Sequence, residues 1–376
     1  MAQATQSMGP RQYDILIIGG GPAGLSAAIA AAESGATSVA LVERKSRWGW
    51  PIQCAELAPR LIVETVALER DVIVQSVEGL RFYLEDEQIS YLRAPGYVLD
   101  RSRFEAMLAD RAARLGVSLW QPANARAISG QGALVTQRGC QHELEARVII
   151  GADGPHSLVR RLLADEPIAM AFAIQRVLPM AGPSDIADVF VSPRYGAGYA
   201  WCFPRGAEAN VGIALSYDRS GELAAALDDL TRRLISAGKI KTATPLRRTG
   251  GLIPVGGPIG RTVFGSIILA GDAAGQVHPL SGAGVATACA CGRLAGEAAA
   301  RAVATRCLSD LSDLSDYEEA WRDLYGDYFA RGLESRVRLD AAARLSTSGE
   351  SPKSERPEVG QVTPHSFVEH VRQAWH

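Results

Sequence analysis

The sequence lacks the features of a membrane-spanning, secreted or metal-binding protein. Its 376 residues contain no run of 18 uninterrupted apolar residues, and the polar stretch from Met1 to Gln12 has no hydrophobic signal core. The six cysteines are scattered without a C-x-x-C pair, so we expect reduced thiols and no metal site. These absences predict a cytoplasmic protein with no integral membrane segment.

Neither sign of charge is in excess. The chain has 39 Lys and Arg against 41 Asp and Glu, a formal net charge of −2. This balance gives no indication of nucleic acid as a partner. Apolar residues make up 47% of the chain, enough for a buried core in one large domain or two smaller ones.

A strand–turn–helix–strand unit opens the chain. The run from Tyr13 to Ile18 is typical of a buried parallel strand, Ala23 to Glu33 is an alanine-rich helix pattern, and Val39 to Val42 is the next strand. The turn between the first strand and the helix reads G-x-G-x-x-G from position 19 to position 24. This context predicts a dinucleotide-binding βαβ unit.

Each glycine of that turn has a physical purpose. Gly19 permits the tight turn, Gly21 lets a pyrophosphate approach the backbone, and Gly24 lets the helix pack on the strand. The helix N-terminus supplies amide donors for the phosphates. Glu43 ends the second strand, 24 residues after Gly19, where a carboxylate can accept both ribose hydroxyls of an adenosine.

Two later acidic glycine turns favour FAD over NAD. Gly151 to Gly154 follows a strand at Ala146–Ile150, and Gly271 to Ala274 follows a strand at Ser266–Ala270. An NAD domain needs no acidic turn more than 200 residues downstream. FAD does, because its ribityl chain and second phosphate reach across the fold. We therefore expect the first βαβ unit to pair in space with elements near residue 270.

The other elements complete the predicted architecture. Antiparallel strands are expected in Gly79–Ala94 and Ala169–Ser216, and helices in Arg103–Leu115, Gly221–Ala237, Gly284–Ala304 and Leu311–Leu345. The fold class is α/β, with a Rossmann-like FAD-binding βαβ domain, an inserted antiparallel-sheet substrate domain and C-terminal helices. The predicted division is a flexible N-terminus (1–12), a discontinuous FAD-binding domain (13–75, 96–165 and 250–305), a substrate-binding sheet domain (76–95 and 166–249), C-terminal helices (306–345) and a flexible tail (346–376).

Several ordered motifs narrow the assignment. Tyr199 to Pro204 reads Y-x-W-x-F-P and is followed by Asn210-Val211-Gly212. These motifs resemble the signature of the geranylgeranyl reductase family, within the flavoproteins related to para-hydroxybenzoate hydroxylase. Segments 53–56 (QCAE), 100–104 and 250–254 (GGLIP) agree with the resemblance, which covers roughly residues 13–305. The family usually has glycine where Leu57 stands, and leucine would narrow the approach to the flavin.

The site residues are predicted from these motifs. The glycine turns and the strand ends predict FAD binding at Gly19, Gly21, Pro22, Gly24, Glu43, Arg44 and Asp153. The resemblance implies further FAD contacts at Ala23, Cys54, Ala55, Arg101, Ala125, Asp272, Pro279, Gly282, Gly284 and Val285.

Four residues are candidates for catalysis: Cys54, Tyr199, Trp201 and His278. Each has a structural alternative. Cys54 can be a small apolar residue beside the cofactor, the aromatic strand can be plain core, and His278 can make a structural hydrogen bond rather than act as an acid or base.

The resemblance favours an FAD-dependent oxidoreductase that reduces a C=C bond of an apolar, isoprenoid-type substrate by hydride transfer from N5 of the flavin. The alternative is an FAD-dependent monooxygenase that hydroxylates an aromatic substrate, including a tryptophan of a partner protein during maturation of its quinone cofactor. An electron-transfer flavoprotein ranks last, because the cysteine spacing offers no iron–sulfur cluster. The expected electron donor is NAD(P)H or another carrier.

Overall fold

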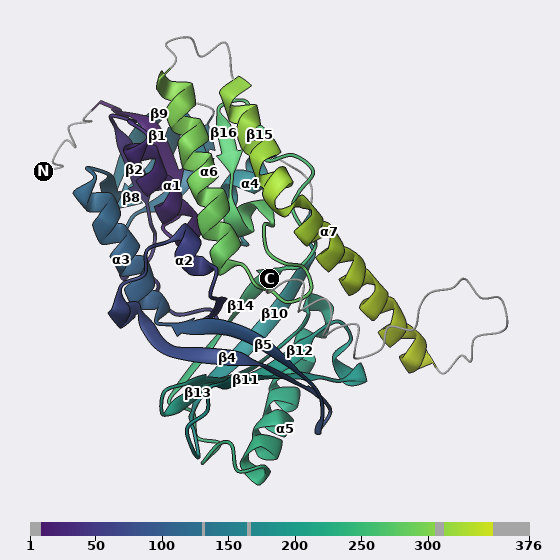
Figure 1. Cartoon of the computed structure of the whole chain (residues 1–376). Helices are drawn as coiled ribbons and strands as arrows, with labels where there is room; N and C mark the ends of the chain where they lie inside the picture. The colour runs from purple at the N-terminus through teal and green to yellow at the C-terminus, as the bar shows by residue number, and fades with distance from the viewer. Residues whose placement is uncertain (1–8, 130–131, 164–166, 305–311, 349–376) are drawn as a thin grey trace, which may run out of the picture.

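A computed structural model describes residues 9–129, 132–163, 167–304 and 312–348 of the chain. The described residues form two sheets with helices around them (Figure 1). The first sheet carries α1, α3 and α6 in the upper half of the view, and the second sheet carries α5 at the bottom. The mixed α/β architecture confirms the predicted fold class.

The first sheet is built around parallel strands from three distant segments. Its main path is β15 (Val263–Phe264), β16 (Ile267–Leu269), β9 (Cys140–Gly151), β1 (Arg11–Ile18), β2 (Val39–Val42) and β6 (Ser118–Trp120). The apolar centres of the strands lie in register, with Ile17 opposite Leu41 on one side and Ile150 on the other. Because β9 also pairs with β16, the expected link between the first βαβ unit and the region near residue 270 is confirmed.

Helices α1 (Pro22–Glu33) and α6 (Val285–Ala304) lie side by side on this sheet (Figure 1). Glycines make the close approach possible. A Cβ at Gly292 would lie 2.1 Å from the carbonyl oxygen of Ala23, and one at Gly296 would lie 2.2 Å from that of Ala27. The same packing brings the N-terminal ends of both helices to one cavity, described below.

The second sheet is largely antiparallel. Its order is β14 (Arg247–Pro254), β10 (Met170–Pro179), β13 (Glu208–Ser216), β12 (Tyr199–Arg205), β11 (Ile186–Val191), β4 (Ile73–Leu84), β5 (Glu87–Leu99) and β3 (Leu57–Pro59). Helix α5 (Leu223–Ser236) covers one face through Leu227 and Leu230. Residues 250–254, which the sequence assigned to the FAD-binding domain, pair with β10 in this sheet.

The remaining elements connect the sheets or lie at their edges. They are α2 (Ile62–Thr65), α3 (Arg101–Arg114), α4 (Leu158–Leu163), and the hairpin of β7 (Asn124–Ser129) and β8 (Gly132–Gln137) beside β9. The hairpin was not expected from the sequence.

Of the residues described after α6, Ser312–Ser348 form one long helix, α7, which agrees with the helix expected at Leu311–Leu345. Tyr317 of α7 donates a hydrogen bond to the carbonyl of Leu269 at 2.9 Å, which ties the helix to the first sheet. The tail predicted to be flexible begins inside α7, and its residues 349–376 lie outside the described residues. So do residues 1–8 of the N-terminus, whereas Arg11 and Gln12 already belong to β1. The domain boundaries stay a prediction.

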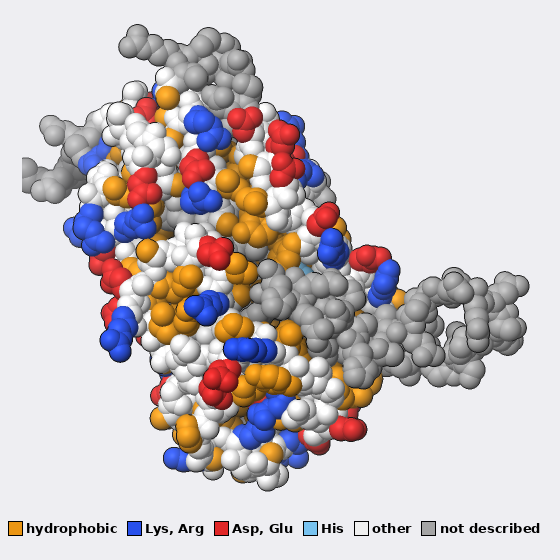
Figure 2. All heavy atoms as spheres, in the orientation of Figure 1, with side chains coloured by type: hydrophobic (Ala, Val, Ile, Leu, Met, Phe, Trp, Pro, Cys, Tyr) orange, Lys and Arg blue, Asp and Glu red, His pale blue; other side chains and the backbone are white. Residues whose placement is uncertain are grey.

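The surface agrees with the balanced composition. On the face shown in Figure 2, basic and acidic side chains are mixed, without a broad patch of one sign. Among the described helices, none is long and apolar enough to cross a membrane.

The close packing of α1 on α6 predicts the effect of Gly292→Ala. The added Cβ would meet the Ala23 carbonyl, so α6 has to move outward, and we expect a loss of about 1–3 kcal/mol in the free energy of unfolding. Urea unfolding followed by circular dichroism measures it. Gly326→Ala on α7 is the matched control, because the nearest atom to its new Cβ is 3.9 Å away. We expect that control to be neutral or stabilising by up to about 1 kcal/mol. Unchanged stability of Gly292→Ala would contradict this account of the interface.

Candidate cofactor and substrate site

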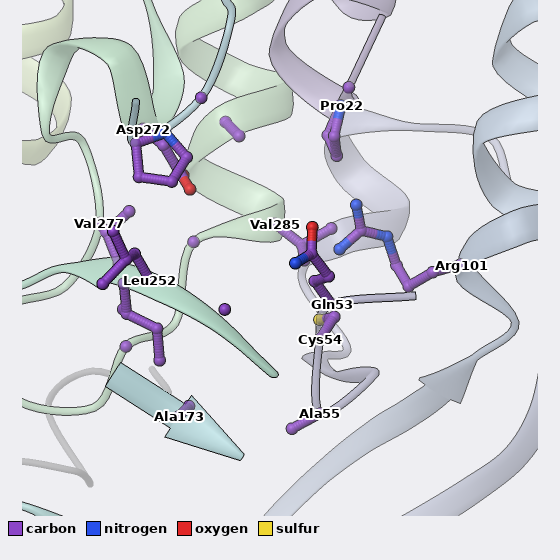
Figure 3. A pocket seen from close by; sticks show the side chains of 18 of the residues that line it. Pro22, Gln53, Cys54, Ala55, Arg101, Ala173, Leu252, Asp272, Val277 and Val285 are labelled. Carbon is purple, nitrogen blue, oxygen red and sulfur yellow. The ribbon is translucent and has the colours of Figure 1, made fainter. Parts of the chain in front are cut away.

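A cavity of about 640 Å³ lies between the two sheets. Its size falls within the roughly 300–1,000 Å³ of ligand pockets in proteins. Figure 3 shows Asp272, Val277 and Leu252 on one side of it and Pro22, Arg101 and Cys54 on the other. The predicted site residues that line it are Gly21, Pro22, Ala23, Glu43, Arg44, Cys54, Ala55, Arg101, Asp153, Tyr199, Trp201, Asp272, Gly282, Gly284 and Val285.

The other predicted site residues do not line the cavity. Gly19 and Gly24 shape the turn instead: Gly19 has φ +108°, and a Cβ at Gly24 would lie 1.9 Å from the Gly19 carbonyl oxygen. Ala125 lies in β7 and packs on the apolar cluster behind β9. Pro279 and His278 lie next to α7, outside the lining.

Glu43 closes the first glycine turn. Its carboxylate accepts the N–H of Gly20 at 2.6 Å and the N–H of Lys45 at 2.7 Å. The residue is only 7% exposed, yet it lines the cavity. Since an ionised carboxylate has about four lone-pair positions, Glu43 can accept further hydrogen bonds from ligand hydroxyls.

The Asp272 carboxylate is available to a ligand. No donor among the described residues bonds its carboxylate, which lines the cavity. Burial raises its pKa to about 6, although the positive charge of Arg101 opposes the shift. The Nε of Arg101 is likewise buried without a partner. An unsatisfied acceptor and an unsatisfied cationic donor in one cavity fit a ligand that carries hydroxyls and phosphates, as FAD does.

Asp153 has a different role from Asp272. Its carboxylate accepts the N–H groups of Leu158 at 2.6 Å and Val159 at 3.4 Å, and the hydroxyl of Ser157. These are the contacts of a cap on α4. Asp153 lines the cavity, but its side chain is engaged in the protein itself.

A buried arginine that no sequence motif indicated joins the two acidic turns. Arg160 donates to the carbonyl of Ala273 at 3.0 Å and to the carbonyl of Pro155 at 2.9 Å. Burial lowers its pKa. In the sequence, Arg160 stands six positions after Gly154, but nothing there indicates its partner, because the second acidic turn is more than 100 residues away.

The segment from Ile52 to Glu56 lines the cavity with Gln53, Cys54 and Ala55. Its first contacts are with β14: the Thr249 hydroxyl donates to the carbonyl of Ile52 at 2.6 Å, and the Gln53 amide donates to the carbonyl of Gly250 at 2.7 Å. Side chains thus satisfy backbone groups that have no strand partner.

Its next contacts are with β10 and β13. The Gln175 amide donates to the carbonyl of Cys54 at 3.2 Å, and its oxygen accepts the indole N–H of Trp201 at 2.9 Å. The Asn210 amide donates to the carbonyl of Ala55 at 3.0 Å. Gln175 therefore fixes the Cys54 backbone and the Trp201 ring together.

Strand β12 presents an aromatic wall to the cavity. Tyr199, Trp201 and Phe203 alternate along the strand and therefore share one face. The centroids of the Trp201 and Phe203 rings are 6.2 Å apart, and their planes are inclined at 27°. A Cβ at Gly212 would lie 2.3 Å from Cζ2 of Trp201, so only glycine leaves room for the indole. The Tyr199 hydroxyl donates to the carbonyl of Ser281 at 2.5 Å, and burial raises its pKa.

Cys54 lies beside a buried ion pair. Its sulfur accepts the N–H of Glu56 at 3.3 Å, and the Arg101 guanidinium interacts with both Cys54 and Glu105. Burial alone would lower the pKa of Arg101, but Glu105 and Cys54 raise it above its usual value. Arg101 is therefore always charged, and it places a positive charge next to the thiol.

His278 is turned away from the cavity. The residue is 3% exposed, and the centroid of its ring lies 4.6 Å from that of Tyr328 on α7. Its Nδ1 is 3.1 Å from the N–H of Ser281 and 3.0 Å from the Ser281 hydroxyl. These contacts favour the structural alternative for His278 over acid–base chemistry on a ligand.

Leu57 lines the cavity at the start of β3, where the resemblance leads one to expect glycine. Leu80, Val189 and Leu252, from strands β4, β11 and β14, also line the cavity. These residues were missed because aliphatic strand residues are not distinctive in a sequence. They extend the aromatic wall into an apolar lining.

Comparisons with known proteins identify relatives of this chain. Residues 12–191 match the family described as FAD binding domain. The chain is 35% identical to digeranylgeranylglycerophospholipid reductase 1 of Methanopyrus kandleri, over 85% of this chain and 88% of that protein. It is 29% identical to digeranylgeranylglycerophospholipid reductase of Methanocaldococcus jannaschii, over 87% of each. The family match confirms FAD as the cofactor that the glycine turns predict.

Solved structures show the same fold. A geranylgeranyl bacteriochlorophyll reductase-like protein of Thermoplasma acidophilum superposes with a TM-score of 0.80 at 24% identity, covering 97% of each chain. PqsL of Pseudomonas aeruginosa, in complex with 2-aminobenzoylacetate, has a TM-score of 0.68 at 21% identity and covers 90% of this chain and 99% of its own.

The raised pKa of Asp272 predicts that Asp272→Asn stabilises the FAD-free protein while weakening FAD binding. In the folded protein the pKa of Asp272 is about 6, against a usual value of 3.8. The charged carboxylate therefore lowers the free energy of unfolding, whereas the protonated carboxyl group does not. The advantage of the variant over wild type should therefore grow from pH 5 to pH 8 by roughly 1 kcal/mol. FAD affinity should fall by about tenfold or more, because a charged acceptor is lost.

Urea unfolding at both pH values and FAD titration measure these effects. Asp153→Asn is the matched control: it weakens the α4 cap and should destabilise the protein by about 1 kcal/mol. An Asp272→Asn variant that is less stable than wild type at pH 8 would contradict the proposed role.

Proposed function

Because the chain belongs to the geranylgeranyl reductase family of FAD-dependent oxidoreductases, we propose that it reduces a C=C bond of an apolar, isoprenoid-type substrate. The substrate class follows the names of the relatives, which are reductases of digeranylgeranylglycerophospholipids.

The observation that carries the proposal is the composition of the cavity. Most of the residues predicted to bind FAD line one continuous cavity together with the aromatic wall of Tyr199, Trp201 and Phe203. An isolated C=C bond offers no polar group for recognition, so its binding depends on apolar surface that excludes water. An apolar wall facing the cofactor residues meets that requirement.

Within this proposal, three polar side chains would have partners on the cofactor. Glu43 would accept the adenosine ribose hydroxyls, Asp272 the ribityl hydroxyls, and Arg101 would donate to a phosphate. The N-terminal end of α6, at Gly284 and Val285, would face the flavin and favour negative charge on the reduced ring. When bound, reduced FAD supplies a hydride from N5.

Cys54 is the proposed proton donor to the second carbon. Its sulfur lies in the cavity lining next to Arg101. The Tyr199 hydroxyl is a poorer donor, because it already donates to Ser281 and burial raises its pKa. Trp201 and Phe203 would hold the substrate against the flavin, and NAD(P)H or another carrier would supply the electrons.

Anaerobic single turnover tests the function. The FAD-loaded protein is photoreduced without oxygen and mixed with vesicles that contain a geranylgeranyl glycerophospholipid. The proposal predicts reoxidation of the flavin without oxygen, together with a lipid mass increase of one H₂ per double bond. If the flavin reoxidises only with oxygen and an oxygen atom enters an aromatic compound or a protein tryptophan, the monooxygenase alternative replaces the proposal.

The role of Cys54 predicts the effect of Cys54→Ala in the same assay. Loss of the proton donor should slow anaerobic reoxidation by the lipid by about 10²- to 10⁴-fold, while FAD content is unchanged. Cys140→Ala is the control, because Cys140 is exposed in β9 and does not line the cavity. A full rate for Cys54→Ala would assign the proton to another donor.

A further inference from the structure

Glu56 combines a strained backbone with a buried charge. Its φ is +67°, in the left-handed region that favours glycine, and only 2% of the residue is exposed. Such a conformation costs about 1–3 kcal/mol in a non-glycine residue and persists only where its surroundings hold it. The contacts of the Glu56 side chain must therefore offset both the strain and the burial of the charge.

Those contacts come from the second sheet and from α3. The carboxylate accepts Nε of Arg205 at 2.9 Å and the Asn210 amide at 3.0 Å. It also accepts the backbone N–H of Arg101 at 3.3 Å, at the first residue of α3. Three donors from three elements thus converge on one buried carboxylate.

Arg205 extends this link. Its side chain is 11% exposed, and its guanidinium lies 3.7 Å from the Asp100 carboxylate and 3.5 Å from the Glu208 carboxylate, in addition to Glu56. Asp100 caps α3 by accepting the N–H groups of Ser102 and Arg103. Because Arg205 is the last residue of β12, one side chain connects the aromatic strand with the start of α3 and with the Cys54 segment.

Two groups that depend on Glu56 lie next to the Cys54 sulfur. The N–H of Glu56 donates to the Cys54 sulfur at 3.3 Å, so the strained turn at Glu56 directs a donor at the thiol. Arg101 donates its backbone N–H to the Glu56 carboxylate, and its guanidinium interacts with the same thiol. A change in the Glu56 conformation would therefore move both neighbours of the sulfur.

We propose that Glu56 and Arg205 are positioning residues: their ion pair holds the Cys54 thiol at the cavity face against Arg101 and couples it to the aromatic strand β12. Stability alone does not account for such a pair, because a buried ion pair stabilises a fold no better than well-packed apolar residues do. The inference rests on the proposed function only for the chemical use of Cys54. The geometry it describes is tested without any substrate.

Alkylation of the FAD-loaded protein by iodoacetamide, followed by peptide mass spectrometry, tests the positioning. Cys140 is exposed and serves as the internal standard, and Cys202 is buried in β12 and reports unfolding. In Glu56→Gln and Glu56→Gly, the rate of Cys54 alkylation relative to Cys140 should rise about tenfold, because the segment opens locally. Cys202 should stay unmodified. Glu56→Gly relieves the strain and so keeps the fold while it removes the ion pair.

Glu208→Gln is the matched control. Glu208 contacts the same Arg205 guanidinium, but from a site that is 33% exposed and away from Cys54. Its relative alkylation rate should match wild type within about twofold. The proposal is overturned if both Glu56 variants stay within that range, if Glu208→Gln changes as much as they do, or if Cys202 is modified together with Cys54. A failure of lipid reduction would leave these rates unaffected, so the two proposals fail separately.

Discussion

In the segment just before β3, the carbonyl groups of Ile52, Cys54 and Ala55 have side chains, rather than the N–H groups of a neighbouring strand, as their hydrogen-bond donors. The second sheet supplies them through the side chains of Thr249, Gln175 and Asn210. The first sheet presents the glycine turn and Glu43 on the other side of the cavity. The cavity keeps its shape because this one segment is bonded to the inserted sheet along its length.

This constraint gives the family signature a physical meaning. The asparagine of the N-V-G motif holds the Cys54 segment, and its Gly212 makes room for Trp201. The tryptophan of the Y-x-W-x-F-P motif is oriented by Gln175, which also bonds the carbonyl of Cys54. Motifs that are far apart in the sequence therefore describe one set of contacts around one cavity.

Local chemistry made much of the fold predictable. A strand, a glycine turn and an alanine-rich helix each follow from short-range periodicity and glycine conformation, and these predictions are confirmed by β1 and α1. The direction of a side chain depends on distant partners instead. Asp153 and Asp272 both follow a strand and a glycine. Ser157 and the start of α4 bind the Asp153 carboxylate, whereas the Asp272 carboxylate stays available to the cavity.

Two other features lay beyond sequence reasoning for the same reason. The ring of His278 packs on Tyr328 of α7, a contact that only the folded chain brings about. The pairing of Glu56 with Arg205 joins residues 149 positions apart, and neither residue is unusual in its own segment. Their conformations follow from tertiary contacts, for which a single sequence carries no local signal.

The central claim is that FAD and the Cys54 thiol share one cavity, and protection of the thiol by the cofactor tests it most directly. The FAD-free protein is alkylated with iodoacetamide alone and with saturating FAD, and the rates at Cys54 and Cys140 are compared by peptide mass spectrometry. The account predicts that FAD slows alkylation of Cys54 by about tenfold or more and leaves Cys140 unchanged. Full binding of FAD with equal alkylation of Cys54 in both states would contradict it.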